Sequence, residues 1–148
     1  MAMDLNSFFP WRLARLAEAV SQAIGQVYGE RFELSRDEWR IVAALAGAGE
    51  VRTAHVLDSS ALDKMRVSRA LARLEERGLV ARAADPQDGR GQLLRLLPPG
   101  EALHRKIVPM VQAREAFLLD ALDAEERVVL DRLIDKLQQR ATTLAQQG

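Results

Sequence analysis

The stretch of residues 62–91 constrains the fold of this chain more than any other part of its sequence. Leucines recur at helical spacing in its first part, arginines lie between them, and Gly78 follows as a stop. Two runs typical of strands come next, at 80–84 and 92–97, and residues 85–91 join them through a charged segment with two glycines. The stretch therefore predicts a helix, a left-handed stop and a β-hairpin.

The predicted helix carries its arginines on one side. At about 100° per residue, the four arginines of residues 64–77 fall within an arc of about 80°. A neighbouring arc, which faces the core, holds Val67, Leu71 and Leu74. Arginine suits guanine because its planar fork bonds the base edge twice, and serine can bond a phosphate or a base. For this helix alone, an exposed basic surface with Glu–Arg pairs is the alternative. Its candidate DNA-binding residues are Lys64, Arg66, Ser68, Arg69 and Arg73.

The hairpin tip adds Asp88 and Arg90 to these candidates. Gly89 and Gly91 flank the arginine, which lets the backbone turn and leaves the guanidinium unobstructed. The minor groove of DNA is about 6 Å wide and admits such a tip. Asp88 is expected to hold the loop by accepting backbone hydrogen bonds, or to brace Arg90 by an ion pair. An ordinary hairpin turn uses Asp and Gly as well and does not need the arginine.

Charge is distributed unevenly along the chain. The formal net charge is +0, which by itself argues against a nucleic-acid binder. Residues 64–95, however, hold eight Lys or Arg against four Asp or Glu, so the predicted helix and hairpin carry a positive excess. A phosphate-binding face needs such segregation. The chain has no cysteine and two histidines, so we expect no disulfide, no thiol chemistry and no metal site.

Capping signals place the other helices. Ser35 and Glu38 form a capping box, in which each side chain bonds a free backbone donor of the other residue. Asp63 is expected to cap the helix that follows it, and Asp123 begins a second capping box. An apolar helix after Pro10 is expected to end at Gly29. The resulting order is four helices, a hairpin and two helices. It predicts a mainly α chain of the α+β class with a winged helix-turn-helix at its centre.

The outer helices carry more apolar surface than the central unit can cover. Leu5, Phe8, Phe9 and Trp11 add to apolar stripes in the first helix and in the last two. We therefore expect a homodimer in which the ends of both chains pack together, although these helices can also pack within one chain. The expected organisation is one domain, 1–148, with a winged helix-turn-helix lobe at 35–97 and dimerisation helices at 5–30 and 99–145.

Short motifs follow one another in a specific order: Asp63-Lys64, Val67-Ser68-Arg69, Leu74-Glu75-Glu76-Arg77-Gly78-Leu79-Val80, Asp88-Gly89-Arg90, and Leu97 with Gly100. In this order and spacing they resemble the MarR (multiple-antibiotic-resistance regulator) family, and the helix order extends the likeness across nearly the whole chain. The resemblance implies an obligate dimer that binds a pseudo-palindromic operator in double-stranded DNA, usually as a repressor. It also implies release by a small, often aromatic or phenolic, anionic ligand.

The resemblance assigns roles to five residues. Ser68, Arg69 and Arg73 would belong to the recognition helix, Arg90 to the wing tip, and Asp88 to the support of the wing. The chain departs from the family in two respects. Proline occupies position 98, where the family often has a threonine as a helix cap, and the lack of cysteine excludes the mechanism of the peroxide-sensing members.

A ligand pocket is expected between the dimer helices and the DNA lobe, where the resemblance places it. Trp11, Tyr28, Trp39 and Arg40 are the candidates to line it, with the arginine pairing a carboxylate. Core packing is the alternative for each aromatic ring, and a plain surface charge is the alternative for the arginine. Neither His55 nor His104 is expected to act as a ligand or a base.

These observations predict a sequence-specific DNA-binding transcription regulator, with repression as its action and a small aromatic or phenolic acid as its effector. The alternative is a winged-helix module that binds protein and not DNA. An enzyme is not expected, because the chain lacks a phosphate-cradling glycine loop, HExxH, GxSxG and a cysteine nucleophile. No cofactor is implied. The first ten residues do not form a secretory signal and no apolar run is long enough for a membrane span, so we expect a cytoplasmic protein.

Overall fold

The computed structural model describes residues 1–148. Its elements are α1 (Phe9–Phe32), α2 (Arg36–Leu45), β1 (Val51–Arg52), α3 (Thr53–Ser60), α4 (Lys64–Glu76), β2 (Val80–Asp85), β3 (Asp88–Leu96), α5 (Pro98–Leu119) and α6 (Ala124–Gln147). The mainly α class and the order of helices and hairpin are confirmed, and β1 is a short strand that the sequence did not indicate. The chain divides into two compact units, Met1–Val111 and Gln112–Gly148, so the boundary falls inside α5.

Side-chain caps start α2, α4 and α6, as the sequence predicts. In the capping box of α2, the Glu38 backbone N–H donates to the Ser35 hydroxyl at 3.1 Å, and the Ser35 N–H donates to the Glu38 carboxylate at 3.2 Å. Asp63 caps α4 by accepting from the Arg66 N–H at 2.9 Å. Asp123 opens α6 with the second capping box. These caps satisfy backbone donors that the first turn of a helix leaves free.

One predicted helix end is confirmed and another is wrong. Gly78, which follows the C-cap residue Arg77 of α4, has a φ of +71°, a conformation that costs glycine little. Gly29, by contrast, stays helical, and α1 continues to Phe32 before Glu33 takes the left-handed conformation at φ 55°. The extra turn is stabilised by packing, because Phe32 lies against the core and Leu34 is buried in it. Burial there outweighs the low helix propensity of glycine.

The hairpin differs from its prediction in where it turns. Strands β2 and β3 pair antiparallel from Val80↔Leu96 to Asp85↔Asp88, with β1 on the other edge of β3. Only Pro86 and Gln87 lie outside the strands, so the loop expected at 85–91 is shorter than predicted. Gly89 and Gly91 both belong to β3. The turn forms earlier because Asp85 accepts a hydrogen bond from the Gln87 N–H at 2.9 Å, as in an Asx turn.

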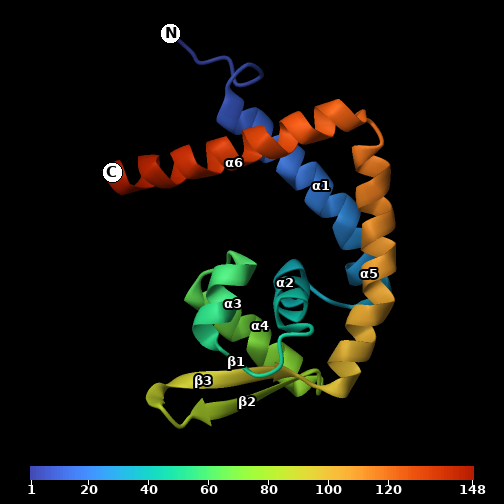
Figure 1. The fold of residues 1–148 in the computed structure, drawn as a ribbon, viewed down its shortest axis with the longest axis vertical. Helices are drawn as coiled ribbons and strands as arrows, with labels where there is room; N and C mark the ends of the chain where they lie inside the picture. The colour runs from blue at the N-terminus through green and yellow to red at the C-terminus, as the bar shows by residue number, and fades with distance from the viewer. The chain divides into compact units, whose positions relative to one another are not determined.

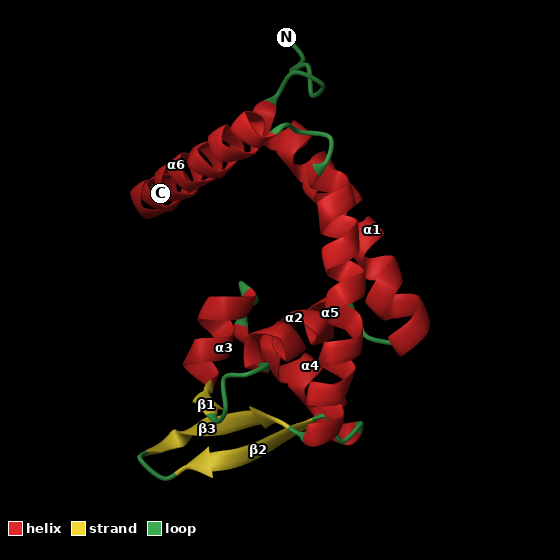
Figure 2. Ribbon diagram, turned by 45° about the vertical axis from the view of Figure 1, so that its right-hand side comes forward, coloured by secondary structure: helices red, strands yellow, loops and turns green.

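The core of the first unit lies among α2, α3, α4 and the sheet, which Figure 1 shows as a helical cluster on one side of the strands. Val67, Leu71 and Leu74 of α4 face it as predicted, and each is at most 2% exposed. Full burial of such a side chain stabilises a fold by about 1.5–3 kcal/mol. The tip of the hairpin extends away from α2, α3 and α4 of the same unit (Figure 2). The core therefore fixes α4 and the base of the hairpin, and leaves the tip exposed.

Gly100, at the start of α5, has closer neighbouring atoms than any other glycine of the first unit. A Cβ atom there would lie 2.5 Å from the Leu79 carbonyl oxygen and 2.6 Å from Leu96 Cδ1. That carbonyl also accepts the Leu97 N–H at 2.8 Å, so it cannot move freely.

We predict that Gly100→Ala lowers the free energy of unfolding by about 1–3 kcal/mol, the range for overpacking. Urea denaturation measures this. Gly89→Ala is the control, because its Cβ would meet nothing within 4 Å; equal denaturation midpoints for the two variants would refute the prediction.

The second unit leaves its apolar residues uncovered. No residue of α6 is buried. Helix α5, part of which belongs to this unit, runs through Pro109 without interruption. Exposed large apolar side chains of the unit are Phe117, Leu118, Val128, Val129, Leu133, Ile134, Leu137 and Leu144. None of the helices has the length and apolar character that a membrane-spanning segment requires.

Candidate nucleic-acid interface

The arginines of α4 differ in what their side chains bind. Arg66 forms a two-pronged ion pair with Asp37 of α2, with its Nη2 at 2.6 Å and its Nε at 3.1 Å from the carboxylate oxygens. Arg66 lowers the pKa of Asp37 by hydrogen bonding, so this carboxylate stays ionised at neutral pH. Such bidentate pairs fix geometry as well as charge. Arg66 therefore braces α4 against α2, a role that the sequence did not reveal.

Arg77 is also committed to contacts within the protein. Its guanidinium donates to the backbone carbonyls of Glu33 and Phe32, each at 3.0 Å, and lies 3.9 Å from the carboxylate of Glu38. These carbonyls belong to the C-terminal turn of α1 and its cap. Arg77 therefore joins the end of α4 to the end of α1. Arg73 lies between the two cases, since its Nε is 3.5 Å from Glu38 and half of its side chain is exposed.

The other predicted DNA-binding residues of α4 present free side chains to solvent. Lys64, Ser68 and Arg69 are exposed, and no hydrogen bond or ion pair engages the ammonium or the guanidinium. The alternative for this helix was an exposed basic surface with Glu–Arg pairs inside the helix. No arginine of α4 pairs with a glutamate of α4. Its Glu75 bonds Arg82 of β2 instead, at 2.9 Å. A surface with unengaged donors beside small side chains can approach base edges and phosphates.

The wing tip presents Arg90 and is stabilised by aspartates. Asp88 accepts from the backbone N–H of Arg90 at 3.1 Å, so the first of its two predicted modes is found. The ion pair between the two side chains is not formed. A Cβ on Gly91 would lie 3.2 Å from the Asp88 carboxylate, a tight contact that the carboxylate would have to relieve by a small shift. The tip thus holds the Arg90 backbone and leaves its guanidinium free.

The strongest support of the wing is an ion pair that the sequence did not indicate. Asp85 is buried, and its carboxylate binds Nε of Arg52 in β1 at 2.9 Å. The same arginine donates to the side chain of Gln87 at 2.7 Å. Asp85 could have been found, because Asp two residues before a turn N–H is a common Asx-turn pattern. Nothing in the local sequence identifies Arg52, which comes from a strand of two residues.

The structure stacks two of the four predicted ligand-binding residues, Tyr28 and Trp39, against each other. Trp39 stacks on Tyr28 at 5.7 Å between ring centroids and on His104 of α5 at 5.8 Å. Burial raises the pKa of the Tyr28 phenol, although Arg36 and Arg40 oppose the shift, so the phenol stays protonated at neutral pH. His104 was not predicted to take part, and the sequence offered no signal for this contact. The three rings form a stack between α1, α2 and α5.

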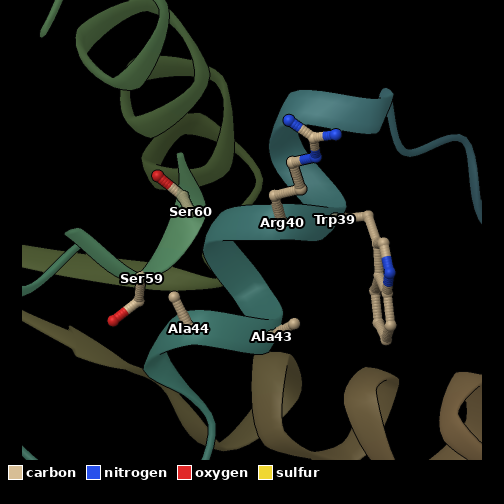
Figure 3. Close-up of a pocket in the computed structure, with 6 residues that line it drawn as sticks. All are labelled: Trp39, Arg40, Ala43, Ala44, Ser59 and Ser60. Atoms are coloured by element: carbon tan, nitrogen blue, oxygen red, sulfur yellow. The ribbon is translucent and has the colours of Figure 1, made fainter. Parts of the chain in front are cut away.

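An open pocket of about 470 Å³ lies beside this stack, between α2 and α3. In Figure 3, Trp39 and Arg40 extend from α2 in different directions and Ser59 and Ser60 belong to α3. Arg40 makes no hydrogen bond or ion pair. Tyr28 does not line this pocket but a separate one of about 430 Å³, with Arg36. The residues lining the first pocket are Trp39, Arg40, Ala43, Ala44, Ser59 and Ser60.

Trp11, the fourth candidate, lies apart from the others within one chain. It precedes Tyr28 by seventeen residues on the same helix, a separation of about 25 Å along the axis. Its side chain is exposed. Within the chain, no group of three or more His, Cys, Asp or Glu side chains gathers in a way that could hold a metal ion.

Comparison with known proteins identifies the relatives of this chain. Residues 32–91 match the model of the MarR family. The chain is 26% identical over 105 residues to the transcriptional regulator HosA of Escherichia coli O111:H-, covering 71% of this chain and 78% of HosA. It is 27% identical over 105 residues to the transcriptional repressor NicR of Pseudomonas putida, covering 71% of this chain and 66% of NicR.

A solved structure extends the likeness to nearly the whole chain. Bordetella bronchiseptica BpsR, whose DNA binding is regulated by 6-hydroxynicotinic acid, is 25% identical, with a TM-score of 0.82 over 93% of this chain and 98% of BpsR. Regulators of this kind bind DNA as dimers and respond to small molecules, and they are not enzymes. The winged helix, the relatives and the matching motifs agree: residues 32–91 match the MarR family, and the chain is similar in sequence and fold to transcription regulators of that family.

Proposed function

We propose that this protein is a homodimeric repressor that binds a pseudo-palindromic operator and releases it when a small aromatic acid binds. One observation carries the DNA-binding part: Arg69 on α4 and Arg90 on the wing, within one compact unit, have guanidinium groups that no other side chain engages. The related NicR is a repressor, which supports repression as the action. Such a role would place the protein in the cytoplasm, where bacterial DNA lies.

The proposed organisation follows the sequence expectation. Residues 35–97 form the DNA-binding lobe, and segments 5–30 and 99–145 join two chains. The uncovered apolar residues of α6 support this assignment, because large exposed apolar surfaces mark interfaces. A symmetric dimer would place two copies of α4 in successive major grooves, so half-sites are expected about one helical turn apart.

Selection of bound duplexes from a random DNA pool tests the proposal. We expect an enriched sequence with two-fold symmetry, and an affinity that falls steeply with salt because phosphate contacts release counterions. The alternative is a module that binds protein and not DNA, which the zero net charge favours. Absence of any enriched sequence, together with salt-independent behaviour, would support that alternative.

The effector is proposed to be an aromatic carboxylate whose charge pairs with Arg40 and whose ring lies near Trp39. Arg40 is unpaired beside the pocket, and BpsR responds to an acid of this class. A ligand can shift DNA binding only if it prefers one state of the protein over another. We therefore predict that 6-hydroxynicotinic acid lowers DNA affinity, and that Arg40→Gln weakens this response by about tenfold, the loss of one charge-assisted contact.

Titration of operator binding at fixed acid concentrations measures this response. The matched control is 6-hydroxynicotinamide, which has the same ring and lacks the carboxylate. The amide should act weakly on the wild type and equally on Arg40→Gln. Calorimetric binding of the acid without any change in DNA affinity would contradict the prediction.

A further inference from the structure

Glu38 has more contacts than its role in a helix cap requires. It is 5% exposed, and its Oε1 accepts the Ser35 N–H that closes the capping box of α2. The same Oε1 lies 3.5 Å from Nε of Arg73, and its Oε2 lies 3.9 Å from Nη1 of Arg77. Both arginines belong to the C-terminal end of α4 or its cap. One buried carboxylate thus faces two cations of the proposed recognition helix.

The two arginines are not held equally. Arg77 has two backbone carbonyl partners in addition to Glu38, so its position does not depend on this carboxylate alone. Arg73 has Glu38 as its only ion-pair partner, and half of its side chain remains exposed. Its guanidinium therefore lies beside the Glu38 carboxylate through Nε, while half of the side chain stays exposed to solvent. An arginine held in this way is preorganised for an external acceptor.

We propose that Glu38 is a positioning residue, which holds Arg73 in one orientation for a phosphate or base of the operator. This inference rests on the proposed DNA-binding function. Helices α2 and α4 are packed side by side, which keeps the Glu38 carboxylate next to the Arg73 guanidinium (Figure 1). Asp37, the residue before Glu38, fixes α4 independently through Arg66. Asp37 thus holds α4 in place through Arg66, and Glu38 orients Arg73.

A positioning role has a different consequence from a structural role. Without the carboxylate, Arg73 keeps its charge but can swing to any nearby phosphate. Specific binding then loses a preorganised contact, while non-specific binding keeps or gains a phosphate contact. A purely structural role would weaken both kinds of binding together, because it would reduce the folded fraction.

The variant Glu38→Gln isolates this effect. Glutamine preserves the capping box, since its amide oxygen also accepts the Ser35 N–H, and only the charge is removed. We expect the ratio of specific to non-specific DNA affinity to fall by about tenfold, as expected when one positioned contact is lost. The plot of log affinity against log salt on non-specific DNA should keep its slope or become steeper. Glu126→Gln is the matched control, because it removes the same charge at the equivalent capping-box position of α6.

A double-mutant cycle with Arg73→Ala completes the test. If Glu38 acts through Arg73, then Glu38→Gln should have no further effect on the affinity ratio in the Arg73→Ala background. Additive losses, or an equal loss of specific and non-specific binding with a lower melting temperature, would overturn the inference. Failure of the wild type to bind any selected duplex would instead refute the proposed function itself, together with this inference.

Discussion

Aspartate substitutions at Leu133 and Leu137 of α6 are expected to separate the dimer and to abolish tight operator binding. These leucines are 45% and 50% exposed in the single chain. At about 100° per residue they fall within an arc of about 80° with Val129 and Leu144. A continuous apolar stripe of this kind needs a partner surface, and a two-fold dimer supplies a second copy of it.

The expected size follows from symmetry. Burial of one leucine contributes about 1.5–3 kcal/mol, and each substitution occurs twice in a two-fold interface. Losing about 4 kcal/mol or more raises the dimer dissociation constant by about a thousandfold or more. A monomer would contact one half-site only, so operator affinity should fall by about a hundredfold or more, because the second contact is no longer intramolecular.

Sedimentation equilibrium and operator titration measure the two effects. Gln138→Asp is the control, because residue 138 lies on the same helix, about 140° around its axis from the middle of the stripe. It should leave both the dimer and the operator affinity unchanged. A dimeric Leu133→Asp, Leu137→Asp double variant would contradict the assignment of α6 to the interface.

The sequence predicted the parts of the structure that depend on local chemistry. Ser35, Asp63 and Asp123 each cap a helix as expected, because an N-cap bond joins residues only three positions apart. Val67 and Leu71 face the core because helical period alone determines their side. The prediction that α1 ends at Gly29 was wrong because the end of α1 depends on long-range packing. The turn after Gly29 packs against the core, and local sequence does not reveal this contact.

The roles of the arginines could not be predicted, because their partners are distant in sequence. Arg66 pairs with Asp37, and Arg77 bonds the carbonyl of Phe32, forty-five residues away. The helical period places all the arginines of α4 on one side of the helix, but it does not show which other elements pack against that side. The structure divides them by partner, and the unengaged one, Arg69, becomes the strongest candidate for reading a base. The stack of His104 on Trp39 was unpredictable for the same reason.

Arg69→Ala is expected to lower operator affinity by about 30-fold or more and to relax base preference at one position in each half-site. A bidentate arginine–guanine contact discriminates by about 1–3 kcal/mol, and a symmetric operator contains it twice. Arg90→Ala should act differently. A wing arginine that contacts the backbone contributes affinity to all sequences, so its loss should reduce the salt dependence and leave the sequence preference unchanged.

Binding of the variants to the selected operator, and to operators changed at each position, separates the two roles. Arg105→Ala, which removes the same charge from an exposed position of α5, serves as the control and should leave operator binding unchanged. Arg66→Ala provides a further comparison, because breaking the pair with Asp37 should lower the stability of the lobe. The division of roles requires Arg69→Ala to be the variant that changes base preference. If Arg69→Ala kept the wild-type preference at every position and Arg66→Ala altered it, the braced arginine would be the reader, and α4 would have to rearrange on DNA to release it from Asp37.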